Sequence, residues 1–208
     1  MLLKDRRFYK SYENDVLKSA FMFPKYKLTF SKAYAEIQQH FRKRSTKEKT
    51  IIFDIDETLI AADSKPPADG MYDVQFEVKV KKCFYTKVFV RLRPFARDVL
   101  KELSKKFEII LFTTGTEDYA EQVSNIFVQK KRTVISHVLS KRYCLYSEEH
   151  DLYIKDLTVL LEGRSFKDII IVDNLVFSYL LQLSNGIPVK EFRGDMRDNQ
   201  LLHLLVYL

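Results

Sequence analysis

Residues 50–60 read TIIFDIDETLI, a short apolar run followed at once by two aspartates, Asp54 and Asp56. The run is β-branched and aromatic, which predicts a buried strand. Two acids spaced i and i+2 where a strand ends can both be directed into one crevice. We therefore expect a polar site at the carboxyl end of this strand.

Further along the chain, an apolar strand followed by a helix recurs twice. Residues 107–112 predict a strand followed by a helix over 116–129, and residues 168–172 predict a strand followed by a helix over 175–183. Pro94 marks the start of another helix. Strands that read as continuous apolar runs between helices indicate a parallel sheet covered on both faces. The predicted fold class is α/β, a doubly wound parallel sheet.

Residues 72–92 hold two alternating runs, which predict a small β-hairpin insertion. Only 58 residues separate Asp54 from Thr113, and 41 separate Thr113 from Lys155, which leaves no room for a large helical cap. A lid excludes water around a small metabolite, whereas an open crevice admits a phosphorylated segment of a protein. We expect the hairpin to be the wall of such a peptide groove.

Polar residues follow the predicted strands, and ligands of α/β sheets bind beyond those carboxyl ends. The residues expected to converge are Asp54, Asp56, Thr113, Thr114, Lys155, Asp173 and Asn174. An acid-x-acid pair alone is a weak signal, because surface turns often contain two aspartates. All the elements in order at strand ends make the signal strong.

The paired acids suit phosphate hydrolysis. A carboxylate can attack phosphorus to form an acyl-phosphate, which divides one hard step into two easier ones. We assign Asp54 as the nucleophile and Asp56 as the acid that protonates the leaving oxygen and then activates water. Thr113, Thr114 and Lys155 are predicted to bind phosphate.

A cation is also expected, because so many anionic groups would otherwise repel one another. Mg²⁺ takes one or two carboxylates together with phosphate oxygens and water. The predicted metal ligands are Asp54, Asn174 and the Asp56 position, the last through its backbone carbonyl. Asp173 is assigned a supporting role.

Residues 50 to about 205 resemble the haloacid dehalogenase superfamily, and within it the small C-terminal-domain phosphatases and NLI-interacting-factor relatives. The matching segments read IFDIDETLI at 52–60, RP at 93–94, FTTG at 112–115, YIKDL at 153–157 and IVDN at 171–174. This resemblance implies the haloacid-dehalogenase-like sheet and a magnesium-dependent phosphoserine/phosphothreonine protein phosphatase with an aspartyl-phosphate intermediate.

Two departures from the family pattern bear on the target peptide rather than on the chemistry. Where the family often has Arg-Glu-Ser-Cys, this chain reads KRYC at 141–144, so Lys141 stands in place of a phosphate-steering arginine. Leu175 and Val176 replace the common Ser-Pro pair after Asn174.

The N-terminal region, residues 1–49, is predicted to be a basic, aromatic extension of a phosphatase domain at 50–208. Residues 1–50 carry 13 Lys and Arg against 5 Asp and Glu, whereas the remainder is nearly neutral. One amphipathic helix is expected over 30–41, before a charged linker at 42–49. Because the excess charge avoids the predicted site, we expect an acidic protein partner or a larger assembly rather than nucleic acid.

Compartment is constrained by what the sequence lacks. No apolar run approaches the length of a membrane span, and no secretory signal is recognisable near Met1. Cys83 and Cys144 are too few for a disulfide framework. We expect an intracellular protein, nuclear or cytoplasmic, with an organellar location left open.

Two other functions stay open from the sequence. One is a non-catalytic scaffold or assembly subunit on the same fold, which the aromatic and basic extension favours. The other is a small-molecule phosphatase, which the missing lid disfavours.

Overall fold

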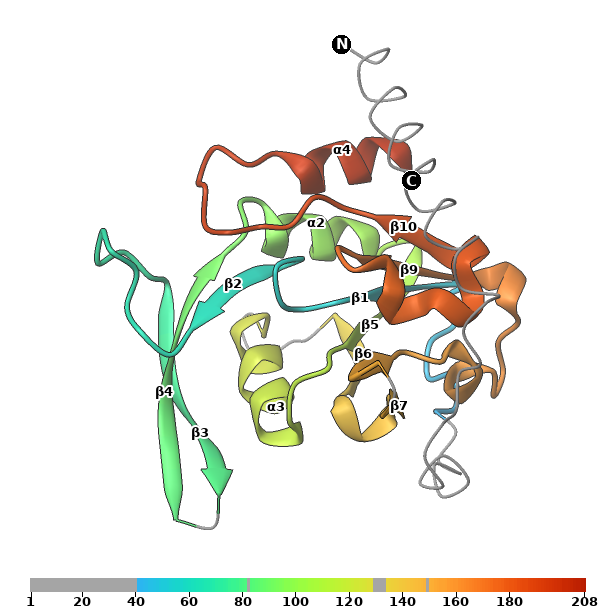
Figure 1. Ribbon diagram of the computed structural model, residues 1–208. Coiled ribbons are helices and arrows are strands. Elements are labelled where there is room, and N and C mark those ends of the chain that lie inside the picture. Colours follow the sequence, from blue (N-terminus) through green and yellow to red (C-terminus); the bar gives the residue numbers. More distant parts are fainter. Residues whose placement is uncertain (1–40, 82, 129–133, 149) are drawn as a thin grey trace.

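The structure is a computed structural model that describes residues 41–81, 83–128, 134–148 and 150–208. Its centre is a five-stranded parallel sheet with the order β10-β9-β1-β5-β6 (Figure 1). The strands are β1 (Lys49–Phe53), β5 (Phe107–Phe112), β6 (Ile135–Leu139), β9 (Ile169–Asp173) and β10 (Gly186–Pro188). The predicted α/β class and the three predicted core strands are confirmed. The helix predicted over 30–41 lies outside the described residues, apart from Phe41.

Alternate residues of β1 serve two cores, one on each face of the sheet. Ile51 and Phe53 belong to one buried cluster, whereas Ile52 belongs to the other. The first cluster lies under three helices, α2 (Ala96–Leu103), α3 (Glu117–Ile126) and α4 (Gln200–Tyr207). The second lies under 3-10 turns, η3 (Lys141–Tyr143), η4 (Leu157–Leu160) and η6 (Val176–Asn185). A strand buried on both faces must be apolar throughout, which is why TIIF carries no alternation.

The helix predicted over 175–183 is wrong in type. Residues of η6 form 3-10 turns, and Tyr179 and Gln182 within it have non-helical backbone angles. The backbone carbonyl of Ser178 accepts from the Lys155 N–H at 2.5 Å, so this segment pairs outside its own turns. Tertiary contacts have overridden the apolar pattern that predicted a regular helix.

The other two predicted helices are present but shorter. Helix α3 begins after Thr116, whose hydroxyl caps it by accepting from the Tyr119 N–H at 3.3 Å. Helix α2 begins after Phe95, which has a left-handed backbone (φ 66°) and a side chain that is 46% exposed. Phe95 was expected in the helix, but it precedes the helix and stays out of the core.

A three-stranded antiparallel sheet with the order β2-β4-β3 projects beyond the parallel sheet (Figure 1). Its strands are β2 (Ile60–Asp63), β3 (Val74–Lys81) and β4 (Phe84–Leu92), so the predicted hairpin gains a third strand. A two-stranded sheet pairs β7 (Leu145–Ser147) with β8 (Leu152–Ile154), and η5 (Phe166–Asp168) precedes β9. Among the described residues, no helix combines the length and apolar character that crossing a bilayer requires.

Candidate active site

The predicted site residues converge where three parallel strands end. Asp54 follows β1, and its N–H donates to the Val172 carbonyl of β9 at 2.9 Å. Thr113 follows β5 and donates its N–H to the Leu139 carbonyl of β6, also at 2.9 Å. Asp173 is the last residue of β9. Each ladder continues one step beyond the strand, which fixes these side chains relative to one another.

Lys155 ties two of these strand ends together. Its Nζ lies 2.5 Å from Asp54 Oδ1 and 2.7 Å from Asp173 Oδ2, and its side chain is 1% exposed. The Ser178 hydroxyl donates to the same Asp173 oxygen at 2.5 Å. One buried ammonium therefore bridges two carboxylates, and η6 supplies the hydroxyl that completes the arrangement.

Charge in this crevice is unbalanced among the described residues. Burial raises the pKa of Asp54 to about 7, against the lowering effect of Lys155, and the Asp173 and Asp56 carboxylates add to the rise. Burial also raises the pKa of Asp56. Burial alone would lower the pKa of Lys155, but Asp173 and Asp54 raise it above its usual value. Three carboxyl groups share one ammonium, an arrangement that favours an added cation or a retained proton.

Asp56 is turned toward β5 and α3. Its Oδ2 accepts from the Thr113 hydroxyl at 3.2 Å, and its Oδ1 accepts a short hydrogen bond from the Tyr119 hydroxyl. The Thr113 hydroxyl in turn accepts from the Gly115 N–H at 2.9 Å. Two donors thus hold the Asp56 carboxyl in one orientation at the mouth of the site.

Asn174 directly follows β9, which flanks β1 on the side opposite to β5 in the sheet. The Thr58 hydroxyl donates to Asn174 Oδ1 at 3.1 Å, and the Asn174 amide donates to Glu57 Oε2 at 3.1 Å. Glu57 has a left-handed backbone (φ 58°), which sharply turns the chain after Asp56. The turn lets one loop place Asp54, Asp56 and Thr58 around a single crevice.

The oxygen atoms at this site suit a magnesium ion that is bound by few protein ligands and retains several water ligands. No group of three His, Cys, Asp or Glu side chains within the described ranges forms a ready metal cluster. One carboxylate (Asp54), one amide oxygen (Asn174) and a backbone carbonyl (Asp56) instead give a mixed set of hard oxygens. Mg²⁺ is typically bound through one or two carboxylates plus substrate phosphate. The surplus of buried negative charge agrees with this fit.

The predicted phosphate-binding residues differ in their surroundings. Lys155 and Thr113 are buried inside the crevice, and Thr114 lies exposed next to it. Lys141 is exposed at the rim, where its N–H donates to the Gly115 carbonyl at 2.8 Å. Its Nζ lies 4.1 Å from the centre of the Tyr153 ring, within the range of a cation–π contact. Whether any of these groups binds phosphate stays a prediction.

Three further residues belong to this arrangement and had no role assigned from the sequence: Tyr119, Thr58 and Ser178. Tyr119 looked like an inward-facing helix residue, and nothing in the 3.6-residue period distinguishes a core tyrosine from one that reaches a carboxylate. All three residues lie within the range, 50 to about 205, that resembles the family, so their positions were visible but their partners were not.

Comparison with known proteins gives one family. The model of the NLI interacting factor-like phosphatases matches residues 49–208. A C. elegans "CTD small phosphatase-like protein 3" is 39% identical over 167 residues, which covers 80% of this chain and 55% of that protein. The human "CTD small phosphatase-like protein" is 31% identical over 160 residues, with 77% and 55% covered. The chain thus spans about half the length of these curated relatives.

A solved structure supports the same fold. The fission yeast RNA polymerase II CTD phosphatase Fcp1 bound to beryllium fluoride superposes with a TM-score of 0.57 at 18% identity. The match covers 77% of this chain and 49% of that one. At such low identity, the likeness is evidence of fold and not of substrate.

Proposed function

Because the chain belongs to the NLI interacting factor-like phosphatase family, we propose that it is a magnesium-dependent phosphoserine/phosphothreonine protein phosphatase. The observation that carries the proposal is the buried bridge from Lys155 to Asp54 and Asp173 beside an oriented Asp56. A merely structural ion pair would balance its charges. Here three carboxyl groups, those of Asp54, Asp56 and Asp173, surround the single ammonium of Lys155. One of the three, Asp56, accepts hydrogen bonds from two hydroxyl groups.

In the first step, Asp54 attacks the phosphorus of the phosphorylated side chain. Lys155 occupies its Oδ1, so Oδ2 is the oxygen that forms the new P–O bond. The bond from phosphorus to the serine or threonine oxygen breaks, and that oxygen takes the proton of Asp56. Burial raises the pKa of Asp56, which favours the protonated form that the step needs.

In the second step, Asp56 acts as a base. It removes a proton from water, and the oxygen of that water attacks the phosphorus of the aspartyl-phosphate. The bond to Asp54 breaks and inorganic phosphate leaves, so Asp54 returns as a carboxylate and Asp56 as an acid. Lys155 offers its positive charge to the phosphoryl group in both steps.

Magnesium would be held by Asp54, Asn174 and the Asp56 backbone carbonyl, and would supply charge neutralisation for the phosphoryl oxygens. Asp173 positions Lys155 and need not touch the ion. The raised pKa of Asp54 also supports a bound cation. A nucleophilic carboxyl must be ionised, and a cation beside it lowers its pKa.

The proposed substrate is a phosphorylated protein segment lying against the hairpin of β3 and β4. Phe76 of β3 lies with its ring centre 6.0 Å from that of Tyr119, whose hydroxyl reaches Asp56. The hairpin therefore adjoins the catalytic carboxyl, and the described residues between Asp54 and Lys155 form no large cap. Residues 1–49 remain the proposed attachment to an acidic partner, and a nuclear or cytoplasmic location remains a prediction.

The test is hydrolysis of para-nitrophenyl phosphate with magnesium, run beside the Asp54→Asn variant and a chelator control. We expect turnover in the wild type and none in either control. Phosphopeptides and sugar phosphates compared on the active protein then separate a protein phosphatase from a small-molecule one. A folded wild-type protein with magnesium and no turnover on either class would favour the non-catalytic scaffold.

A further inference from the structure

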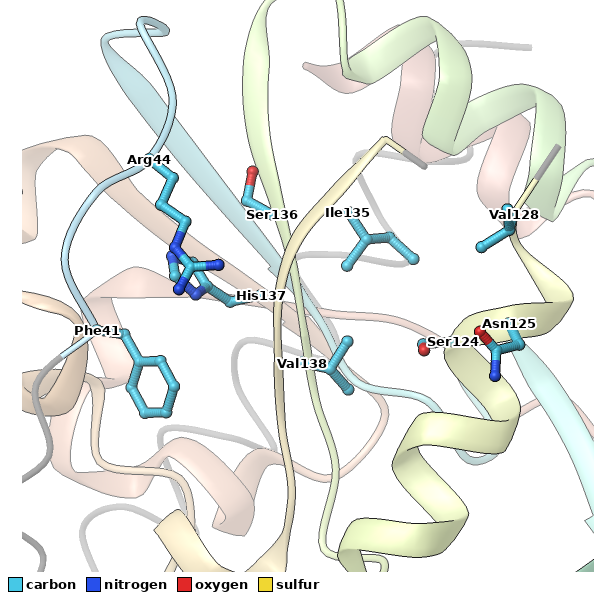
Figure 2. Close-up of a pocket in the computed structure, with 9 residues that line it drawn as sticks. All are labelled: Phe41, Arg44, Ser124, Asn125, Val128, Ile135, Ser136, His137 and Val138. Atoms are coloured by element: carbon cyan, nitrogen blue, oxygen red, sulfur yellow. The ribbon is translucent and has the colours of Figure 1, made fainter. Parts of the chain in front are cut away.

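A hollow of about 390 Å³ lies along the edge of the sheet, and none of its lining residues belongs to the candidate active site. Strand β6 runs through it, as Figure 2 shows. Ser124, Asn125 and Val128 line it from α3 and the turn that follows. Phe41 and Arg44 line it on the opposite side of the strand (Figure 2). The hollow is therefore a channel that follows β6, with one wall on each face of the sheet.

The backbone of β6 offers unused hydrogen-bonding groups to this channel. Among the described strands, β6 pairs with β5 alone. The Leu139 carbonyl points to β5, because it accepts from the Thr113 N–H. Successive residues of a strand direct their backbone groups to opposite sides, so those of Val138 point to the free edge, where no backbone partner is found in the described part of the chain. Such an edge is a template for an added strand.

Arg44 supplies the charge of the channel. Its side chain is exposed, and its guanidinium has no ion pair or hydrogen bond with any residue that the structure describes. Burial lowers the pKa of His137, so the neighbouring imidazole is neutral at pH 7 and adds no charge. An unpaired guanidinium beside an apolar wall suits a carboxylate from a partner.

The wall that carries Arg44 is fixed in place by buried contacts. Arg164 forms a bidentate pair with Glu108, at 2.8 and 2.9 Å, and also donates to the Phe41 carbonyl at 2.5 Å. The Arg44 N–H donates to Glu108 at 3.3 Å, and the Phe41 N–H donates to the Val159 carbonyl at 2.8 Å. The channel is thus preorganised, which reduces the entropy lost on binding.

We propose that the edge of β6 is a docking site for an extended, acidic segment of a partner protein. The segment adds to β6 as a strand, directs an Asp or Glu side chain to Arg44, and places an apolar side chain beside Val128 on the α3 side. Residues 1–40 of the chain itself are a poorer occupant, because they carry 8 Lys and Arg against 4 Asp and Glu. The site would recruit a partner while the active-site crevice stays open.

The test uses three unphosphorylated peptides: one alternating Val and Glu, one alternating Val and Lys, and one of Gly and Glu. Binding to the isotope-labelled full chain is followed by NMR, with hydrogen exchange of the Val138 amide as a second measurement. We expect the Val–Glu peptide to shift amides of β6 and of residues 124–128 and to protect the Val138 amide. Arg44→Glu should weaken this binding roughly tenfold, as the loss of one charge-assisted contact predicts. Arg42→Glu, an equal charge change outside the channel, should leave it nearly unchanged.

Several results would overturn the proposal. Equal weakening by both charge reversals, or equal binding of the Gly–Glu peptide, would indicate non-specific attraction. Shifts confined to Asp54 and Thr113 would place the peptide in the active site instead. A Val138 amide already protected in the free protein would assign the edge to the chain's own residues. No outcome depends on phosphatase activity, so failure here is separate from failure of the proposed function.

Discussion

In the proposed mechanism, the Asp56 carboxyl has two opposite tasks. As an acid it must hold a proton, which burial favours, and as a base it must give that proton up. The Tyr119 and Thr113 hydroxyls both lower its pKa by donating to the carboxylate, so they oppose burial. Burial and these two hydroxyl donors therefore act in opposite directions on the pKa of Asp56.

Replacement of Tyr119 by Phe should shift this balance toward the protonated acid. Loss of the hydroxyl raises the pKa of Asp56, so the alkaline limb of the kcat/KM profile for phenyl phosphate should move to higher pH. We also expect kcat to fall roughly tenfold, because Asp56 loses one of its orienting bonds. The control is Tyr146→Phe, which removes a β7 hydroxyl that donates to Asp151 in the turn before β8. Identical profiles for both variants would contradict the role given to Tyr119.

Lys155 has a role in the proposed reaction and also contributes to the stability of the fold. It is 1% exposed between two carboxylates, so its removal leaves buried negative charge without a partner. Lys155→Met should lower the free energy of unfolding by about 3–5 kcal/mol, measured by urea denaturation without metal. Adding Asp54→Asn to Lys155→Met should recover part of the loss. An unchanged urea midpoint in the single variant would show that the bridge adds little to stability.

At the level of elements, three strands of the parallel sheet position the candidate site, and its polar side chains lie at or just after their carboxyl ends. Beyond the polar residues at the starts of β1 and β5, the strands β1, β5 and β9 are apolar and largely buried, and the polar residues of the candidate site begin where their ladders end. The hairpin of β3 and β4 is different, because the apolar residues of β3 continue beyond the part of the strand that packs against the core. Phe76 and Val78 pack inward, whereas Val80, which lies at a bulge near the end of β3, is 56% exposed. An apolar stripe that continues past the core is available to a peptide.

Val80→Asp should therefore separate peptide substrates from small ones. We expect KM for a phosphopeptide to rise roughly tenfold, since contact with one buried valine contributes about 1.5 kcal/mol. Turnover of para-nitrophenyl phosphate should not change, because that substrate is too small to reach Val80, which lies four residues beyond Phe76 on β3. The matched control is Gln75→Asp, which places the same charge on the exposed face of β3, away from the inward-packed Phe76 and Val78. Equal effects of the two variants would remove the hairpin from the groove.

For the molecule as a whole, distant segments of the chain support the site. Arg93, 1% exposed, donates to both oxygens of Asp198 at 2.8 Å and to the Thr58 carbonyl at 3.0 Å. The segment before α4 is thereby fastened to the loop that carries Asp54 and Asp56. Burial of charged groups at the centre of the fold also makes stability depend on pH.

The sign of that dependence follows from Asp54. Its pKa is raised from 3.8 to about 7 in the folded state. Between about pH 4 and 7 the folded protein holds a proton that the unfolded chain has lost, so this group lowers the free energy of unfolding as pH rises. Glu108 acts oppositely, since Arg164 holds its pKa below the usual value despite burial. Because the two groups act in opposite directions, the pH dependence of the free energy of unfolding of the wild type does not isolate Asp54. The contribution of Asp54 is measured by comparison with a variant.

We expect Asp54→Asn to be more stable than the wild type at pH 7.5 without metal, by about 1–3 kcal/mol, and to show little advantage at pH 4. Urea denaturation at both pH values measures the difference. Magnesium added at pH 7.5 should stabilise the wild type and not the variant. The same stability difference at both pH values would exclude the raised pKa as its cause.

Local pattern was sufficient for the sheet and for the identity of the strand-end residues. A central parallel strand must be apolar on both faces, so TIIF and its counterparts at 107–112 and 168–172 were recognisable without any partner. The edge strands β6 and β10 and the short β2 were not predicted, because ISHVL, GIP and IAAD are brief and only partly buried. The helix expected at 175–183 failed for a related reason, since apolar spacing does not reveal a backbone carbonyl given to Lys155.

The sequence thus predicted the α/β class and the hairpin from its apolar periodicity, and the paired aspartates and the lysine from their places beside predicted strands and from the family resemblance. The contacts between these side chains were decided by the tertiary structure alone. It placed Lys155 between Asp54 and Asp173, turned Asp56 toward Tyr119, and brought Arg44 beside an edge of β6 that no other described strand pairs with. These pairs are separated by tens of residues, and the distance and burial that set their charges exist only when the strands lie side by side.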